Sequence, residues 1–339
     1  MKIGWWDHFE QLRGVPLAQQ YDERLQLLQI ADAAGFHGYH IAEHHLTPLD
    51  MAPSPLMFLT AAARVTEQIR LGTLVLVLPL YHPVRLLQEL YMLDHLSHGR
   101  LMPGVGKGVR DVEHEWFGHD QSESRDRFDE CLAILQSALA TDRLDFHGAY
   151  FHYDDEPTNY TTIQKPMRFW YAGNVESALE RGMNVIGFGP REAFDHYAAV
   201  WAQRQAAGDP AYQGEEPLAG STRRVFIAPT DDAARVIAER AWAMHHENFV
   251  ATSLRIGGKP GPPGYKGVPA ADGGVVYGSP DTVRTALVDL LDQLGPNHNY
   301  FAPSFQWGDL SYSEASQSLG LFISEVMPAL QSMHTPEPV

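Results

Sequence analysis

Residues 69–78 read Ile-Arg-Leu-Gly-Thr-Leu-Val-Leu-Val-Leu, a run whose apolar and β-branched side chains are typical of a buried strand. Pro83 then opens a segment of helical period that ends near Leu96. A second strand-like run, Leu101–Gly106, follows that segment. These three pieces together predict one β/α unit, in which a strand is followed by a helix and then by the next strand.

The same alternation extends in both directions along the chain. We expect eight strands, at Lys2–Trp6, His37–Ala42, Ile69–Leu78, Leu101–Gly106, Phe169–Ala172, Asn184–Phe188, Arg223–Ile227 and Tyr300–Ala302. One helical segment follows each strand, except that two, Asp231–Ala251 and Ser279–Leu294, follow the seventh. Eight such units in 339 residues predict an α/β protein with the (β/α)8 fold of a TIM barrel.

A doubly wound parallel sheet is the competing architecture. Such a sheet would normally carry a dinucleotide-binding fingerprint after its first strand, and Gly4-Trp5-Trp6-Asp7-His8 is not one. The barrel is therefore favoured.

Two stretches interrupt the alternation, and we expect both to be insertions in a single domain that spans residues 1–339. One lies before the fifth strand, at about 141–166, and the other after the seventh strand, at about 253–274. The Gly- and Pro-rich part of the second, Gly257–Gly274, has no periodicity. A long irregular loop in a compact enzyme is commonly a lid, and a disordered insertion is the alternative.

Composition excludes several classes of partner. Acidic residues exceed basic ones by 42 − 25 = 17 and no basic block occurs, so nucleic acid and anionic membranes are poor partners. The single cysteine, Cys131, excludes an internal disulfide and suits a reducing compartment. The N-terminus has no signal-peptide character, and no apolar run is long enough to span a bilayer. We therefore expect a soluble cytoplasmic protein.

The residues suited to chemistry cluster where the expected strands end. His44 and His45 follow the second strand, His82 the third, Lys107 the fourth and residues 171–174 the fifth. In barrels of this kind the active site lies at the carboxyl ends of the strands, so these side chains should meet at one mouth. Because adjacent residues of a strand face opposite sides, one histidine of the pair can face the site while the other braces it.

A phosphate site is the second feature of this mouth. Lys107 and Arg125 provide two cations, and Ala172-Gly173-Asn174 precedes a helical segment that contains Ser177. Two cations and a helix start suit a single phosphate group. The alternative for each residue is an ordinary surface salt bridge. The glycine-rich turn around Lys107 lacks the Walker spacing, so it is not a nucleotide-binding P-loop.

Metal and nucleophilic chemistry fit the sequence poorly, and we expect no metal site. His44 and His45 are adjacent, and the segments Glu113-His114-Glu115 and His245-His246-Glu247 lack the spacing of a zinc protease. No Gly-x-Ser-x-Gly elbow occurs, and Cys131 lies in mid-helix, where we expect it to be buried and inert. A bound organic cofactor suits the remaining inventory of histidines, cations and aromatic residues.

These residues resemble those of the bacterial luciferase-like, flavin-dependent monooxygenases, closely so over about the first 140 residues. The matching stretches are Met1-Lys2-Ile3-Gly4, Ala42-Glu43-His44-His45-Leu46-Thr47, Gly72-Thr73, Val77-Leu78-Pro79, His82-Pro83-Val84-Arg85, Leu93-Asp94, Gly99-Arg100, residues 104–108, Phe117-Gly118 and Ser124-Arg125. Only the Glu-His-His and His-Pro-Val-Arg segments are specific by themselves. Matches in the second half are generic.

The resemblance implies a TIM barrel that binds reduced FMN, delivered by a separate NAD(P)H:flavin reductase. Oxygen would add at flavin C4a, and the resulting (hydro)peroxyflavin would oxidise a small apolar organic substrate of the aldehyde or ketone kind. His44 matches the catalytic histidine, which can act as an acid or a base near neutral pH. A homodimer formed through the helices next to strands two and three is also implied.

The resemblance further implies which residues hold the cofactor. Arg125 matches a phosphate-binding arginine, and Lys107 stands where relatives often have arginine, so the charge is kept but the bidentate fork is lost. A non-proline cis peptide is expected within residues 73–76, which would place Val75 beneath the flavin. Relatives carry serine or threonine after strand five, where this chain has Tyr171, Gly173 and Asn174, so backbone amides and Ser177 must contribute more. The matching motifs add His45 and His82 to the expected cofactor-binding set.

Two other functions remain open. A 5-deazaflavin-dependent hydride-transfer enzyme shares this fold, but its long anionic cofactor favours an extended basic groove, which this acidic chain lacks. A flavin-binding protein without catalysis is the other alternative, and the intact His44 argues against it. Trp5, Trp6, Tyr81 and Trp307 are candidates for an apolar substrate pocket, although core packing explains each of them equally well. Neither the substrate nor light emission is specified by these motifs.

Overall fold

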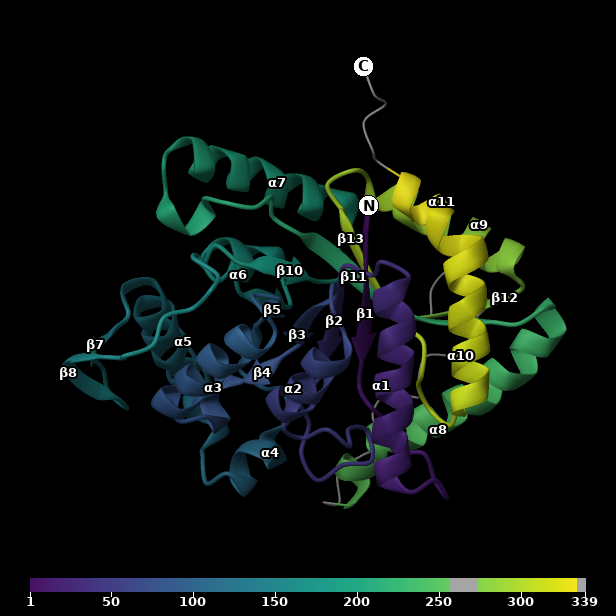
Figure 1. The fold of residues 1–339 in the computed structure, drawn as a ribbon, viewed down its shortest axis with the longest axis horizontal. Helices are drawn as coiled ribbons and strands as arrows, with labels where there is room; N and C mark the ends of the chain where they lie inside the picture. Colours follow the sequence, from purple (N-terminus) through teal and green to yellow (C-terminus); the bar gives the residue numbers. More distant parts are fainter. Residues whose placement is uncertain (256–273, 334–339) are drawn as a thin grey trace.

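The computed structural model describes residues 1–255 and 274–333. The strands lie near the centre of the molecule and most helices surround them, as Figure 1 shows. Most of the second expected insertion, residues 256–273, lies outside the described part. No helix in the described ranges is both long enough and apolar enough to cross a membrane.

One parallel sheet forms the centre of the fold. Its eleven strands pair in the order β4-β6-β9-β10-β11-β13-β1-β2-β3-β5, and β12 pairs with β11. Their bounds are β1 Lys2–Asp7, β2 Gly38–Ile41, β3 Arg70–Thr73, β4 Leu76–Val77, β5 Leu101–Met102, β6 Gly104–Gly106, β9 Trp170–Ala172, β10 Asn184–Ile186, β11 Ala219–Ile227, β12 Val275–Gly278 and β13 Tyr300–Ser304.

The third and fourth expected strands are each divided into two short pieces. β3 and β4 flank the Leu74-Val75 peptide, and β5 and β6 flank Pro103. β4 pairs with β6 at one end of the pairing path and β3 pairs with β5 at the other, so the same two divided strands lie at both ends of the path. The sheet is therefore curled in a TIM-barrel-like arrangement, which confirms the α/β class. The Leu74-Val75 bond is cis, as the resemblance implied for this range.

Helices alternate with the strands and cover the outside of the sheet. They are α1 Leu17–Ala33, α2 Pro55–Val65, α3 Pro83–Leu96, α4 Asp111–Trp116, α5 Ser124–Thr141, α6 Val175–Leu179, α7 Arg191–Ala206, α8 Asp231–Arg255, α9 Pro280–Leu294, α10 Tyr312–Leu321 and α11 Met327–Ser332. Four single turns complete the described chain: η1 Leu78–Leu80, η2 Gln121–Glu123, η3 Pro210–Tyr212 and the π-helical η4 Phe322–Val326. Proline occupies the first position of α2, α3 and α9, where its missing N–H costs no intrahelical hydrogen bond.

Three elements differ from the sequence-based expectation. β12 is a strand where only helical segments were expected, and it extends the sheet beside the carboxyl half of β11. α4 begins three residues after Gly108, where no helix was expected. An antiparallel hairpin, β7 Arg143–His147 and β8 His152–Pro157, lies between α5 and β9 and is separate from the main sheet. This hairpin is at the left edge of the view in Figure 1.

A buried polar group fixes the carboxyl end of β1. Asp7 forms an ion pair with Arg24 of α1, and both side chains are almost fully buried. Tyr39 of β2 donates a hydrogen bond to Asp7 Oδ2 at 2.6 Å, and Arg24 Nε donates to Gln306 Oε1 at 2.8 Å. The group therefore joins β1, α1, β2 and the loop after β13 immediately behind the strand ends that carry the candidate site.

Candidate active site

A cleft of about 240 Å³ lies at the carboxyl ends of the first strands. Four of the expected site residues line it: His44, Val75, Lys107 and Tyr171. His8, Glu43 and Glu113 line it as well, although none of them was expected to be a site residue. The parallel register of β1, β2 and their neighbours brings these side chains together from distant parts of the chain.

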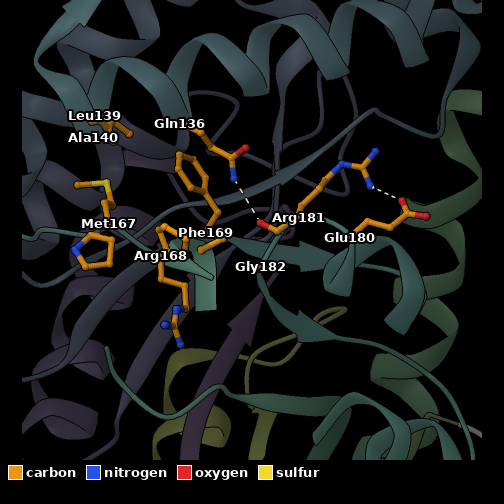
Figure 2. Close-up of a pocket in the computed structure, with 12 residues that line it drawn as sticks. Gln136, Leu139, Ala140, Met167, Arg168, Phe169, Glu180, Arg181 and Gly182 are labelled. Atoms are coloured by element: carbon orange, nitrogen blue, oxygen red, sulfur yellow. Dashed lines mark hydrogen bonds and ion pairs between the residues drawn. The ribbon is translucent and has the colours of Figure 1, made fainter. Parts of the chain in front are cut away.

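A larger hollow of about 490 Å³ lies elsewhere, at the amino end of β9 between α5 and α6. Figure 2 shows Gln136 hydrogen-bonded to the backbone of Arg181 and the Arg181 side chain paired with Glu180. Gln136 Nε2 donates to the Arg181 carbonyl oxygen at 3.4 Å, and Arg181 Nη1 donates to Glu180 Oε2 at 3.0 Å. We take the smaller cleft as the candidate active site because the ionisable groups converge there, at the end of the strands where barrel enzymes act.

His44 faces the cleft and is held by a buried carboxylate from α4. Its Nδ1 lies 3.3 Å from Glu113 Oε1, and the backbone N–H of His44 donates to Asp50 Oδ2 at 3.2 Å. Burial alone would raise the pKa of Glu113, but hydrogen bonds from His44 and from the His45 amide, with the charge of Arg110, hold it below its ordinary value. The Glu113 carboxylate is therefore ionised, and Nδ1 of a neutral His44 carries the proton.

His45 is turned toward a second buried carboxylate. Its Nε2 lies 2.9 Å from Glu43 Oε1, and its ring packs edge-on against Phe117. Glu43 Oε2 also accepts the Val77 backbone N–H at 2.9 Å, which ties the loop after β2 to β4. His45 thus braces the loop that carries His44, and it does not line the cleft.

A second polar group from β11, α8 and the segment after β1 stands beside His44. The His8 ring centroid lies 5.5 Å from that of His44, and Arg224 Nη2 donates to His8 Nδ1 at 3.3 Å. Burial, followed by the charges of His44 and Arg224, keeps the pKa of His8 well below its ordinary value. His245 lies behind His8 with its Nδ1 2.6 Å from Glu10 Oε1.

The residues expected to bind a phosphate differ in their burial and in their position relative to the cleft. Lys107 is partly buried at the cleft, whereas Arg125 is exposed at the second position of α5. Neither forms an ion pair with any residue in the described ranges. Gly173 and Asn174 are exposed, and Asn174 Oδ1 accepts the Ser177 N–H at 2.8 Å, so that amide is already occupied. Since α6 has only five residues, its amino end is a weak anion site by itself.

Several other candidates lie away from the cleft. His82 is exposed at the start of α3, with its ring 5.9 Å from that of Phe151. Trp5 and Trp307 are buried in the core, in agreement with the packing interpretation. Cys131 is buried as expected, and burial raises the pKa of its thiol to about 12. Among the described residues, one group has the spacing of metal ligands, and it is exposed on the β7–β8 hairpin: His147, His152 and Asp154.

Comparisons with known proteins show the family and the fold of the chain. Residues 1–298 match the family model described as luciferase-like monooxygenase. The protein y4wF of Sinorhizobium fredii is 31% identical over 338 residues, which cover 96% of each chain. The monooxygenase RslO1 from Streptomyces bottropensis superposes with a TM-score of 0.81 at 24% identity, over 97% of this chain and all of that one.

A solved structure with a bound cofactor also shares the fold. The oxygenating constituent of 3,6-diketocamphane monooxygenase from Pseudomonas putida, solved in complex with FMN, superposes with a TM-score of 0.74 at 20% identity. That match covers 97% of this chain and 98% of the other. With the family model matched over most of its length, this chain belongs to the luciferase-like monooxygenase family.

Proposed function

We propose that the protein is the oxygenase component of a two-component monooxygenase that uses reduced FMN and O2 to oxidise a small apolar organic substrate of the aldehyde or ketone kind. The observation that carries the proposal is the position of His44, which faces the cleft with Nδ1 held by an ionised carboxylate. A second support is that a relative of the same fold binds FMN.

The walls of the cleft suit a flat, anionic cofactor. Val75 and Tyr171 offer apolar surface from β-strand ends, and the turn at Gly106 and Gly108 brings the backbone close to its neighbours. A Cβ atom on Gly106 would come within 2.6 Å of Val75 Cγ2, so this wall has room only for bare backbone. Lys107 and Arg125 would hold the phosphate, with Gly173, Asn174 and Ser177 next to the same end of β9. His82 and His45 would support the cofactor site from outside the cleft.

His44 would transfer the proton to and from the reacting groups. When bound, reduced FMN supplies the two electrons that activate O2. The Glu113 carboxylate keeps the Nδ1 proton of His44 in place, which leaves Nε2 free to accept a proton from the reacting groups or to return one. Glu43 and His45 keep the loop in register with β4, so the imidazole is held at a fixed position relative to Val75.

The proposal includes two protein partners. A separate NAD(P)H:flavin reductase would supply the reduced cofactor. A second copy of the chain would pack against α2 and α3, where Met57 and Met92 are large apolar side chains with 74% and 62% exposure.

Rapid mixing of the anaerobic protein and reduced FMN with oxygenated buffer tests the proposal. The wild type should show a distinct spectral phase before oxidised flavin appears, whereas His44→Ala should bind FMN normally and lose about 100-fold or more of its substrate turnover. Oxidation of FMN at its free-solution rate in the presence of saturating wild-type protein would refute the monooxygenase assignment.

A further inference from the structure

Two histidines that follow neighbouring strands line the cleft. The Nδ1 atom of one lies against a hydrogen-bond donor, and the Nδ1 atom of the other lies against an acceptor. His8 follows β1 and His44 follows β2, and the parallel pairing of these strands places the two rings 5.5 Å apart. Both side chains line the cleft. The chemistry expected of His44 leaves His8 without a role.

The partner of His8 decides which nitrogen carries its proton. Arg224 Nη2 lies 3.3 Å from His8 Nδ1. A guanidinium offers only donors and keeps its charge, so His8 Nδ1 must be the acceptor and Nε2 must carry the hydrogen. Arg224 is held in position by two indole rings, with its guanidinium carbon 5.2 Å from the Trp6 centroid and 5.9 Å from that of Trp242. The His8 Nε2–H group has no hydrogen-bond partner among the described residues.

His44 is held in the other tautomer. The carboxylate of Glu113 accepts from its Nδ1, so the lone pair of a neutral His44 lies on Nε2. The cleft therefore presents one fixed N–H donor and one fixed nitrogen acceptor side by side. Aliphatic and alkene carbons form no hydrogen bond with either nitrogen, whereas a carbonyl oxygen can accept one from the N–H donor.

We propose that His8 and His44 form an oxygen-binding subsite for the organic substrate, in which His8 Nε2–H donates to a carbonyl oxygen while His44 Nε2 exchanges the reacting proton. This inference rests on the proposed function and specifies which residue recognises the carbonyl. Arg224 is a positioning residue, because it acts on the substrate only through the tautomer of His8. The subsite selects ketones and aldehydes over hydrocarbons of the same shape, since a hydrocarbon would bury the His8 donor without a partner.

Long-range proton–nitrogen correlation spectra of protein with isotope-labelled histidine test the tautomers directly. We expect a neutral His8 protonated at Nε2 and a His44 protonated at Nδ1, each assigned by loss of its signals in a variant. Arg224→Met should leave His8 as a mixture of tautomers, while Arg224→Lys should restore the Nε2–H form in part. A wild-type His8 protonated at Nδ1, or already mixed, would overturn the proposal.

A matched pair of probes tests recognition. Acetophenone and ethylbenzene share one carbon skeleton and differ by the carbonyl oxygen. Acetophenone should shift the His8 Nε2 signal, and its Kd should rise about 2- to 10-fold in His8→Phe and stay near the wild-type value in His8→Gln, which keeps a donor. Ethylbenzene should bind wild type and His8→Gln similarly and His8→Phe at least as tightly, because only His8→Phe removes the donor that a hydrocarbon leaves without a partner. His196→Phe, an exposed histidine on α7, is the control for general effects of the substitution.

Two results would refute the subsite: equal effects of the two probes on His8, or no effect of acetophenone up to its solubility limit. Spectra are recorded with and without oxidised FMN. Failure of FMN to bind would refute the proposed function, whereas the tautomers and the response to acetophenone in the flavin-free protein would still report on the subsite. Thermal unfolding of each variant identifies any that lose binding because they fail to fold.

Discussion

Replacing Lys107 and Arg125 together with alanine should weaken FMN binding far more than riboflavin binding. The two flavins share the isoalloxazine ring and differ by the phosphate group, so their comparison isolates the contribution of the cations. Neither side chain has an acidic partner among the described residues, and the whole chain carries a formal net charge of −17. Each cation is therefore available for a ligand phosphate in a chain that otherwise repels anions.

The expected magnitude follows from the burial of each cation. Lys107 is partly buried at the cleft, so a charge-assisted hydrogen bond to phosphate should contribute about 1.5–3 kcal/mol. Arg125 is exposed, and solvent screening limits its contribution to about 0.5–1 kcal/mol. The sum of about 2–4 kcal/mol corresponds to an increase of about 30- to 1,000-fold in the Kd for FMN.

Fluorescence titration of both flavins with wild type and variant measures this difference. Riboflavin affinity should change by less than about threefold. Arg85→Ala on α3 is the control for loss of positive charge, because Arg85 is exposed and pairs with Glu89. If FMN and riboflavin lose affinity equally, or if Arg85→Ala has the same effect as the double variant, the phosphate is bound elsewhere and the assignment of these cations is wrong.

Three further predictions concern stability and reactivity. Arg24→Met should lower the free energy of unfolding, measured by urea titration, by about 3–5 kcal/mol, because it leaves Asp7 buried without its cation. The control Arg13→Ala, at an exposed ion pair, should lower it by less than about 1 kcal/mol. Similar losses in the two variants would refute the role of the buried ion pair. Burial alone would raise the pKa of Glu10, but His245, Arg224 and Asn248 hold this pKa below 4.5. The ionised carboxylate therefore stabilises the fold above about pH 4.5, and this contribution disappears as the pH falls through the lowered pKa. The stability gap between wild type and Glu10→Gln should therefore narrow below about pH 4.5, and a gap that widens there would contradict the sign. The Cys131 thiol, whose pKa burial raises to about 12, should resist disulfide reagents at pH 8 until the protein unfolds, and immediate labelling would show that it is accessible.

Local sequence patterns predicted the positions of most strands and helices well, but they predicted the pairing of the strands only in part. Apolar runs such as Ile69–Leu78 have a periodicity that depends on local burial, so most strands and helices are found within a few residues of the expected positions. β12 was missed because its four residues follow a Gly- and Pro-rich stretch and directly precede α9, where the helical pattern dominates. Its strand conformation comes from pairing with β11, which is a tertiary contact that leaves little signal in a short run.

The candidate site shows the same division between local and distant information. His44, Lys107 and Tyr171 were expected at the cleft because strand ends in a barrel share one mouth, whereas Val75 was expected only from the family resemblance. Glu113 and His245 were considered only as metal ligands, since each lies on a helix whose orientation the sequence does not specify. The contacts Glu113–His44 and His245–Glu10 join residues 69 and 235 positions apart. A buried carboxylate with a histidine partner is visible only after folding brings the two together.

The two glutamate–histidine contacts are linked, and this has a consequence for how the protein can evolve. Glu113 Oε1 lies near both the His44 ring and the His45 backbone amide, while Glu43 holds the His45 ring and the Val77 amide. Substitutions among Glu43, His44, His45 and Glu113 should therefore show strong epistasis, because the effect of each depends on the identity of the others. Single-site libraries would find few viable paths through these positions, and directed evolution of new substrate range should vary them jointly in one combinatorial library.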